Sequence, residues 1–200
     1  MDRDSQLIDP AFLHHQEPQQ DVLSIVGLTP DEWNRLELYA RVHMNEYFQL
    51  ISNLSIRPSS ILEWGSGYST YLLCHFGKQW GTQHFLTLDH IQDYQEKILK
   101  RLQPHPFLEV KTLDLIGGIW PWDTQPHNYA SYPTTLNRTY DLIFVDGRRR
   151  NECLLAASRI LAAGGILILH DIWRERYRMG MELFRELERF DQYAIMTRRD

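Results

Sequence analysis

The sequence predicts an α/β protein, a three-layer sandwich in which helices cover both faces of a mostly parallel sheet of six or seven strands. Short apolar runs alternate with segments of helical periodicity from about residue 60 to residue 197. A glycine-rich turn, Gly65-Ser66-Gly67, joins the first run to the helical segment that follows it. This alternation is typical of right-handed strand–helix–strand units, which build a parallel sheet.

The first part of the chain, residues 1–57, is predicted to form an arm and a helical extension packed on a main domain of residues 58–200. The arm is polar to about residue 28. Thr29 and Glu32 then form a capping box around Pro30, which favours a helix start. An apolar stripe indicates one helix to about residue 54.

The glycine turn follows the apolar run 61–64 and opens a helix. Gly65 and Gly67 allow backbone N–H groups to approach a ligand, and the helix start adds the positive end of its dipole. Glu63 stands at the carboxyl end of the strand, where open α/β sheets bind ligands. Thr70 replaces the third glycine of a dinucleotide motif, and no lysine follows as in a phosphate loop.

The remaining elements are predicted in order. They are a helix to about 76 closed by Gly77, a strand over 84–88, a helix over 91–102, strands over 108–113 and 140–147, a helix over 151–161, a strand over 166–171, a helix over 179–190 and a last strand over 193–197. Only one strand follows the last helix in this prediction. A sheet of six strands would have an edge open to a second copy of the chain, which favours a homodimer.

The segment 115–139 interrupts this rhythm with glycines, prolines and aromatic residues, among them Trp122 and Tyr129. Stretches of this length without secondary structure inside a compact domain are usually functional. Two interpretations stay open, an aromatic lid over a substrate and a loop that packs its own aromatic side chains. A short helix over 128–136 is compatible with either.

Composition narrows the classes of function. The 200 residues are 43% hydrophobic and 24% charged, with a net charge of −5, so we expect no nucleic-acid partner. Cys74 and Cys153 are too far apart for a metal motif and are interpreted as buried thiols. The polar N-terminus and the lack of a long apolar run predict a cytoplasmic protein without a membrane span.

These motifs resemble those of the class I S-adenosylmethionine-dependent methyltransferases, which have a Rossmann-like fold. The resemblance covers about residues 60 to 197 and rests on E-x-G-x-G, on acids that end successive strands, and on Ala162-Ala163-Gly164-Gly165. It implies S-adenosylmethionine as cofactor. The residues that it implies for cofactor binding are Glu63, Gly65, Ser66, Gly67, Ser69, Asp89, His90, Asp114 and Asp146.

The Val-Asp-Gly and His-Asp stretches resemble the O-methyltransferase branch of that family. The resemblance implies Asp146, His170 and Asp171 as candidates for removing a proton from the acceptor. In metal-dependent members Mg²⁺ is held by two acids and an asparagine. Asp146 and Asp171 match the acids, but Ile172 stands at the asparagine position, so a metal is an open question.

Six arginines follow two of the predicted strands, at the substrate edge of the sheet. They predict a small acceptor with a carboxylate or phosphate, bound by Arg148, Arg149, Arg174, Trp122 and Tyr129. A solvated face paired with nearby glutamates is the alternative. Two other functions stay open, an S-adenosylmethionine-binding protein without transferase activity and a Rossmann-like oxidoreductase.

Overall fold

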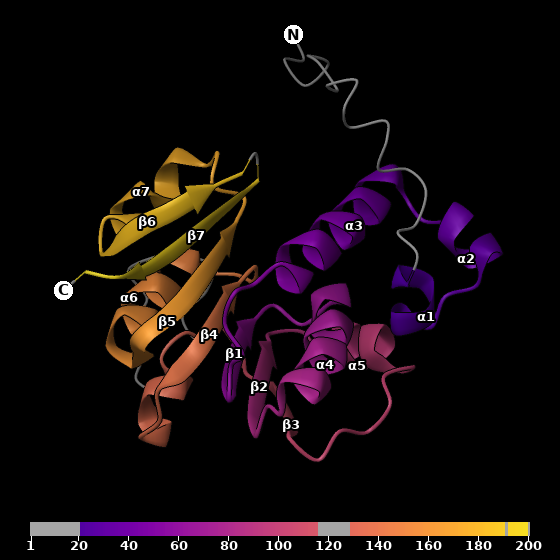
Figure 1. Ribbon diagram of the computed structural model, residues 1–200, viewed down its shortest axis with the longest axis horizontal. Coiled ribbons are helices and arrows are strands. Elements are labelled where there is room, and N and C mark those ends of the chain that lie inside the picture. Colours follow the sequence, from indigo (N-terminus) through magenta and orange to yellow (C-terminus); the bar gives the residue numbers. More distant parts are fainter. Residues whose placement is uncertain (1–20, 116–128, 191, 200) are drawn as a thin grey trace, which may run out of the picture.

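The computed structural model describes residues 21–115, 129–190 and 192–199. Its centre is one seven-stranded sheet in the order β3-β2-β1-β4-β5-β7-β6 (Figure 1). The strands are β1 Ser60–Trp64, β2 His84–Asp89, β3 Leu108–Thr112, β4 Tyr140–Val145, β5 Leu161–His170, β6 Phe184–Arg189 and β7 Tyr193–Arg198. The first five strands are parallel, and β7 runs antiparallel to β5 and to β6. The predicted fold class is therefore confirmed.

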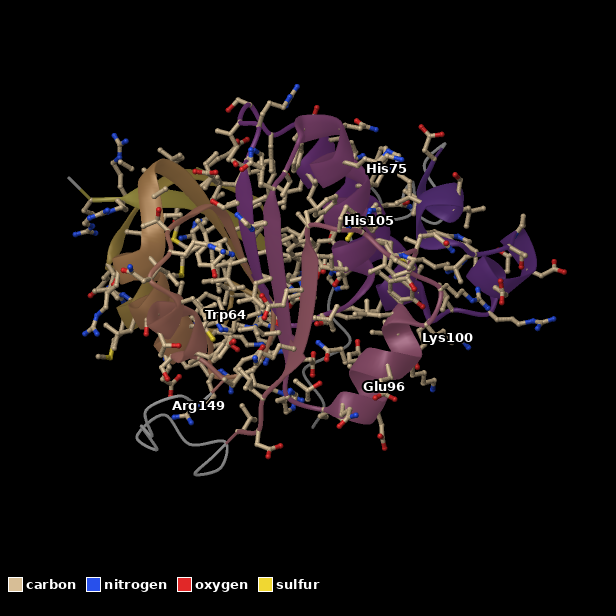
Figure 2. The ribbon with its side chains drawn as sticks, turned by 90° about the horizontal axis from the view of Figure 1, so that it is seen from below. Trp64, His75, Glu96, Lys100, His105 and Arg149 are labelled. Atoms are coloured by element: carbon tan, nitrogen blue, oxygen red, sulfur yellow. The ribbon has the colours of Figure 1, made fainter. Side chains whose placement is uncertain are left out.

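Helices lie on both faces of the sheet. Figure 1 shows α3 (Leu38–Ser52), α4 (Tyr68–Trp80) and α5 (Gln92–Leu99) on one side, and α6 (Arg150–Ile160) and α7 (Arg178–Met181) on the other. Alternate strand residues enter the two apolar cores: Ile61 packs with the α3 and α4 side chains, whereas Trp64 lies between the sheet and α6 (Figure 2). The first turn of α6 therefore begins at the carboxyl end of β4, next to the ends of β1 and β5.

The end of the chain differs from the predicted helix over 179–190. Only α7 is helical there, and β6 follows it as the edge strand of a hairpin with β7. The apolar residues Phe184, Leu187 and Phe190 recur every three positions, which imitates a helix. The strand nevertheless pairs with β7, with a bulge between Glu186 and Glu188, and Leu187 and Phe190 are exposed. Pairing with β7 thus completes the seventh strand.

Two further boundaries differ from the prediction. The helix predicted to about residue 54 is divided into α2 (Pro30–Asn34) and α3, preceded by the short α1 (Val22–Val26). Helix α4 runs past Gly77 and ends at Gly81, which takes the left-handed conformation of a helix C-cap.

The segment after residue 128 forms one 3-10 helix, η2 (Tyr132–Leu136). A second 3-10 helix, η3 (Glu175–Tyr177), leads into α7. No helix in the described ranges is long and apolar enough to cross a membrane.

Candidate active site

A pocket of about 480 Å³ opens at the carboxyl edge of the sheet, where the strand order reverses beside β1. This is the position at which open α/β sheets bind ligands. The turns after β1, β2, β4 and β5 form its floor, and α3 forms the opposite wall. The residues that line it are Tyr39, Ala40, His43, Met44, Tyr47, Gly65, Ser66, Gly67, Tyr68, Ser69, Asp89, His90, Ile91, Tyr94, Asp146, Gly147, Arg148, Arg150, His170 and Asp171.

The glycine turn forms one side of the pocket. Gly65 has φ 101°, and its N–H donates to the carbonyl of Leu88 at 2.8 Å. A Cβ on Gly65 would lie 2.6 Å from the backbone nitrogen of Gly147, so the turns after β1 and β4 touch through backbone alone. A Cβ on Gly67 would meet only Ser69 Oγ, at 3.9 Å. The turn is therefore tight on its inner side and open on its outer side, which suits a ligand held by backbone groups.

Glu63 lies behind this turn and is not among the pocket-lining residues. Its side chain is fully buried and accepts hydrogen bonds from Ser69 Oγ, Thr70 Oγ1 and Thr87 Oγ1, each 2.6 Å long. Thr70 Oγ1 also accepts the N–H of Gly67, at 2.9 Å. Glu63 thus supports the glycine turn through hydroxyl groups. The sequence analysis instead predicted a direct contact between Glu63 and the cofactor.

The protonation of Glu63 gives a testable pH dependence. Burial raises its pKa from 4.5 to about 7, against the opposing effect of the Ser69, Thr70 and Thr87 hydrogen bonds. The folded state therefore binds the proton more tightly, and this contribution to stability is complete below about pH 4.5 and lost as the pH rises through about 7. In Glu63→Gln this loss should disappear. Between pH 4.5 and pH 8 the wild type should lose about 3 kcal/mol of unfolding free energy relative to the variant.

Urea unfolding at several pH values measures this difference. The matched control is Glu96→Gln, which changes an exposed carboxyl on α5 (Figure 2) and should keep the wild-type profile. Parallel pH profiles for the wild type and Glu63→Gln would contradict the assignment.

The other predicted cofactor residues fall into two groups, those that line the pocket and Asp114, which does not. Asp89 ends β2 on the pocket wall, and its Oδ1 accepts the N–H groups of His90 and Ile91 at 2.7 and 3.0 Å, which fixes the carboxylate. Ser66, held by Thr87 and by Gln95, and Ser69 also line the pocket. Asp114 is exposed beyond β3 and is not a lining residue. The predicted residues of the glycine turn and of β2 are thus together, and Asp114 stands apart.

The three predicted catalytic residues lie together at the ends of β4 and β5. His170 Nδ1–H donates to Asp146 Oδ1 at 2.6 Å, and Asp171 Oδ1 lies 3.9 Å from His170 Nε2. The rings of Tyr193 and His43 each have a centroid 4.7 Å from that of His170, which fixes the imidazole between them. His170 Nε2 is buried and has no hydrogen-bond partner among the described residues. The dyad therefore contains one buried ring nitrogen without a hydrogen-bond partner, on a residue that lines the pocket.

The carboxylate of Asp146 is kept ionised by its neighbours. Burial alone would raise its pKa, but the hydrogen bond and charge of His170, together with Arg150 and Tyr47, lower it below 3.8. Tyr47 Oη donates to Asp146 Oδ2 at 2.5 Å, and burial beside that carboxylate raises the pKa of Tyr47 well above 10. Tyr47 is therefore a neutral donor. Because Asp146 accepts at Nδ1, a neutral imidazole at His170 carries its proton on Nδ1 and has Nε2 as its acceptor atom.

The two acids that could hold Mg²⁺ are already paired with arginines. Arg150 Nη2 lies 2.9 Å from Asp146 Oδ1, and Asp171 Oδ2 lies 3.1 Å from both Arg150 Nη1 and Arg174 Nη2. Ile172, at the position of the missing asparagine, is apolar and buried. The residues present do not fit a divalent cation in this arrangement, because a guanidinium occupies the space between the carboxylates.

The predicted substrate residues are dispersed. Arg148 is exposed and lines the pocket. Arg149 is buried beside Glu152 at the start of α6 (Figure 2). Tyr129 is fully buried, and its main-chain carbonyl accepts Trp64 Nε1–H at 3.0 Å. Trp122 lies outside the described residues. Of the predicted substrate residues Arg148, Arg149 and Arg174, Arg148 alone lines this 480 Å³ pocket.

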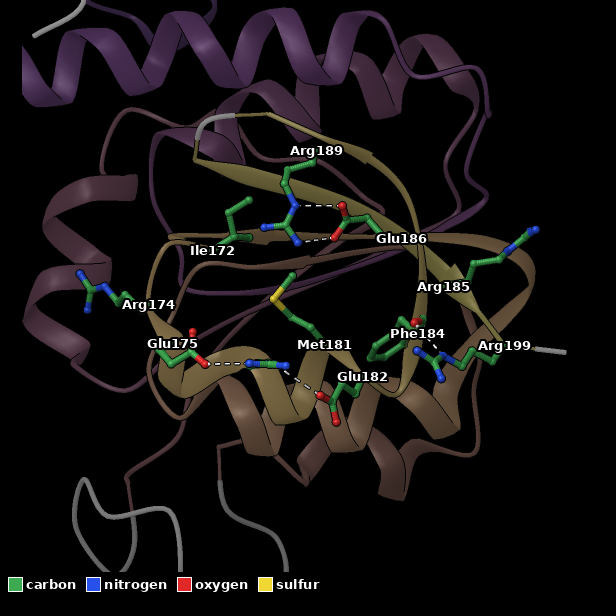
Figure 3. Close-up of a pocket in the computed structure, with 11 residues that line it drawn as sticks. Ile172, Arg174, Glu175, Met181, Glu182, Phe184, Arg185, Glu186, Arg189 and Arg199 are labelled. Atoms are coloured by element: carbon green, nitrogen blue, oxygen red, sulfur yellow. Dashed lines mark hydrogen bonds and ion pairs between the residues drawn. The ribbon is translucent and has the colours of Figure 1, made fainter.

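Arg174 lines a second and larger pocket, of about 700 Å³, between α7 and β6 (Figure 3). The charged side chains of each wall pair within that wall: Arg189 with Glu186 on β6, and Arg178 with Glu175 and Glu182 on the α7 side. Figure 3 shows these two separate groups of pairs around the pocket. The smaller pocket is the better candidate for function, because it contains the glycine turn, the fixed Asp89 and the buried histidine.

Helix α3 supplies five lining residues, and two of them, His43 and Tyr47, contact the His170–Asp146 dyad although the sequence analysis did not select them as site residues. His43 is buried, with Nδ1 at 3.1 Å from Glu46 Oε2, and its Nε2 has no hydrogen-bond partner among the described residues. Tyr47 contacts Asp146 as described above. Tyr39, His43 and Tyr47 recur every four residues, which places them on one helix face. That spacing of polar aromatic side chains was the available signal.

The fold and the glycine-turn pocket define a Rossmann-like protein with a ligand site at the strand switch. Residues 62–172 match the family described as Methyltransferase domain, which is more than half of the chain. The protein belongs to this methyltransferase-domain family. No curated protein matches the sequence.

Solved structures of methyltransferases share the fold. A methyltransferase-like protein from Silicibacter pomeroyi is 21% identical, with a TM-score of 0.52 over 76% of this chain and 81% of that one. The N-methyltransferase NodS from Bradyrhizobium japonicum with S-adenosylhomocysteine is 14% identical, with a TM-score of 0.53 over 90% and 98%. The TDP-rhamnose 3′-O-methyltransferase CalS11 of calicheamicin biosynthesis is 12% identical, with a TM-score of 0.55 over 96% of each chain.

Proposed function

We propose that this protein transfers a methyl group from S-adenosylmethionine to a hydroxyl of a small-molecule acceptor. The observation that carries the proposal is the buried His170–Asp146 dyad: His170 lines the pocket beside the glycine turn, and its Nε2 atom has no hydrogen-bond partner among the described residues. A proton acceptor is needed for a hydroxyl nucleophile. The methyltransferase-domain family supports the reaction class, and NodS, which shares the fold, binds S-adenosylhomocysteine.

The glycine-turn half of the pocket fits the cofactor. The tight inner side and open outer side of Gly65-Ser66-Gly67 leave room for a methionine moiety against backbone N–H groups. The fixed carboxylate of Asp89 can accept the two hydroxyls of a ribose, with His90 and Ile91 beside it. The pocket volume of about 480 Å³ is within the usual range for such ligands.

The α3 half of the pocket fits the acceptor. Tyr39 and His43 line it opposite the strand ends, and Arg148 is the exposed lining arginine that supports an anionic acceptor, since Arg150 is already paired with Asp146 and Asp171. Pocket walls that combine aromatic rings with a few polar groups suit a small molecule better than a nucleic acid, as does the net charge of −5.

Bound S-adenosylmethionine supplies a methyl group already activated by a sulfonium. The protein aligns the acceptor and removes its proton. The acceptor oxygen bonds to the methyl carbon while the carbon–sulfur bond breaks, and the acceptor proton passes to His170 Nε2. Asp146 stabilises the imidazolium through Nδ1, and Tyr47 holds Asp146 in place. The products are the methylated acceptor, S-adenosylhomocysteine and a proton that His170 later releases to water.

Calorimetric titration with S-adenosylmethionine and S-adenosylhomocysteine tests the cofactor. Asp89→Ala should weaken binding by about 10- to 100-fold, since a hydrogen bond to a charged group contributes about 1.5–3 kcal/mol. Asp93→Ala, an exposed acid on α5, is the control and should bind like the wild type.

An acceptor screen that detects S-adenosylhomocysteine then tests transfer. No binding by the wild type would contradict the cofactor assignment. Tight binding without turnover on any hydroxyl acceptor would contradict the enzymatic proposal and favour a binding protein.

A further inference from the structure

The guanidinium of Arg150, the first residue of α6, lies buried between the ends of β4 and β5. Nε donates to the carbonyl of Gly147 at 2.9 Å, and Nη2 donates to the carbonyl and to Oδ1 of Asp146, both at 2.9 Å. Nη1 donates to the carbonyl of His170 and pairs with Asp171 Oδ2 at 3.1 Å. Because a guanidinium has five N–H groups, these three carbonyl and two carboxylate oxygens match its whole donor set.

Carbonyl and carboxylate oxygens are also the ligands of hard divalent cations. Ligand atoms of Asp146, His170 and Asp171 lie within 4.8 Å of one another, as in a metal-binding cluster. Arg150 nevertheless uses Asp146 Oδ1 and Asp171 Oδ2, one oxygen of each acid. A divalent ion would have to displace the guanidinium, and its charge would repel the guanidinium at contact distance.

The charges at the site already balance without a metal. The carboxylates of Asp146 and Asp171 face the guanidinium groups of Arg150 and Arg174. Arg150 is also fixed from the side, since its guanidinium carbon lies 5.4 Å from the centre of the Tyr177 ring. Its position is therefore set by five oxygens, an aromatic ring and the start of a helix.

We propose that Arg150 is a built-in cation that takes the place of a divalent metal ion, so that methyl transfer by this protein is metal-independent. Arg150 acts as a positioning residue, because it touches Asp146 and not the reacting atoms. By holding Asp146 Oδ1 it keeps that oxygen on His170 Nδ1 and leaves Nε2 for the acceptor proton. Only the part of this inference that concerns activity rests on the proposed function.

Binding of Mn²⁺, measured by electron paramagnetic resonance, tests whether Arg150 occupies the position of a metal ion, and it requires no acceptor. The wild type with S-adenosylhomocysteine should not bind Mn²⁺ at millimolar concentration. Arg150→Ser should gain one saturable site, and the added change Asp171→Asn should remove it. Arg159→Ser, at the exposed far end of α6, is the control for loss of an arginine and should remain without a site. A wild-type site lost in Asp171→Asn, or a folded Arg150→Ser without a site, would overturn the proposal.

Activity gives a second, independent measurement. Methyl transfer by the wild type should be unchanged by a chelator and by added Mg²⁺. In Arg150→Ser kcat should fall by about 100-fold or more while the KM for S-adenosylmethionine changes little, since a misplaced base affects the chemical step. Arg150→Lys keeps the charge and should recover part of kcat. Loss of wild-type activity on chelation, restored by Mg²⁺, would overturn the proposal. If no acceptor is methylated, that result counts against the proposed methyl transfer. The Mn²⁺ measurement then decides the proposal that Arg150 replaces a metal ion.

Discussion

Replacing His170 with alanine should lower kcat for methyl transfer by about 100- to 10,000-fold, the usual contribution of a general base. His170 lines the pocket, its buried Nε2 is the proposed proton acceptor, and Asp146 holds the other ring nitrogen at 2.6 Å. Affinity for S-adenosylhomocysteine should change by less than about threefold, because the proposed cofactor contacts lie in the turns after β1 and β2. Single-turnover rates at saturating acceptor, together with calorimetry, separate the two effects.

The matched control is His84→Ala, which removes an exposed imidazole at the opposite, amino end of β2. It should leave both the rate and the affinity unchanged. If His170→Ala keeps a rate within about threefold of the wild type, another group accepts the proton, and Asp171 becomes the first candidate because its Oδ1 is 3.9 Å from the ring nitrogen.

Gly65→Ala should both destabilise the protein and abolish tight cofactor binding. The backbone of Gly65 has φ 101°, and a Cβ would lie 2.6 Å from Gly147 N and 2.8 Å from Asp146 C. Backbone strain and the clash together should cost on the order of 3 kcal/mol or more. Affinity for S-adenosylhomocysteine should fall by about tenfold or more, since the turns after β1 and β4 must separate. Urea unfolding and calorimetry measure the two losses.

Gly81→Ala isolates the strain from the clash. Gly81 also has a positive φ, 77°, but a Cβ there meets nothing within 4 Å. Its unfolding free energy should fall by about 1–2 kcal/mol, with cofactor affinity unchanged. Equal losses in Gly65→Ala and Gly81→Ala would show that contact between the turns after β1 and β4 is unimportant.

The parallel part of the fold was predictable because most of its strands are short apolar runs with a polar residue at or just after their carboxyl end. Phe144 and Val145 before Asp146 illustrate this pattern, and it requires no tertiary information. The last strand pair was not predictable in the same way. Phe184, Leu187 and Phe190 have the spacing of a helix, and only pairing with β7 decides between the two structures.

The candidate site was predictable where it depends on strand ends. Asp89, Asp146 and His170 end parallel strands, and these ends meet at one edge of the sheet. The roles of neighbouring arginines could not be read in this way. Arg149, in the left-handed conformation with φ 51°, pairs with Glu152, whereas Arg150 pairs with Asp146 and Asp171, and the sequence alone does not distinguish these partners. His43 likewise acquires its position only when α3 packs across the strand ends.

Helix α3 stands outside the strand–helix–strand units, although it forms the wall of the pocket opposite the strand ends. Substitutions at Tyr39 can therefore reshape the proposed acceptor side while the glycine turn and the dyad keep their supports. His43 and Tyr47 are the exceptions on this face, because His43 packs on the ring of His170 and Tyr47 donates to Asp146. Under the proposed function, the choice of acceptor and the chemistry can thus evolve separately, with His43 and Tyr47 at the boundary between them.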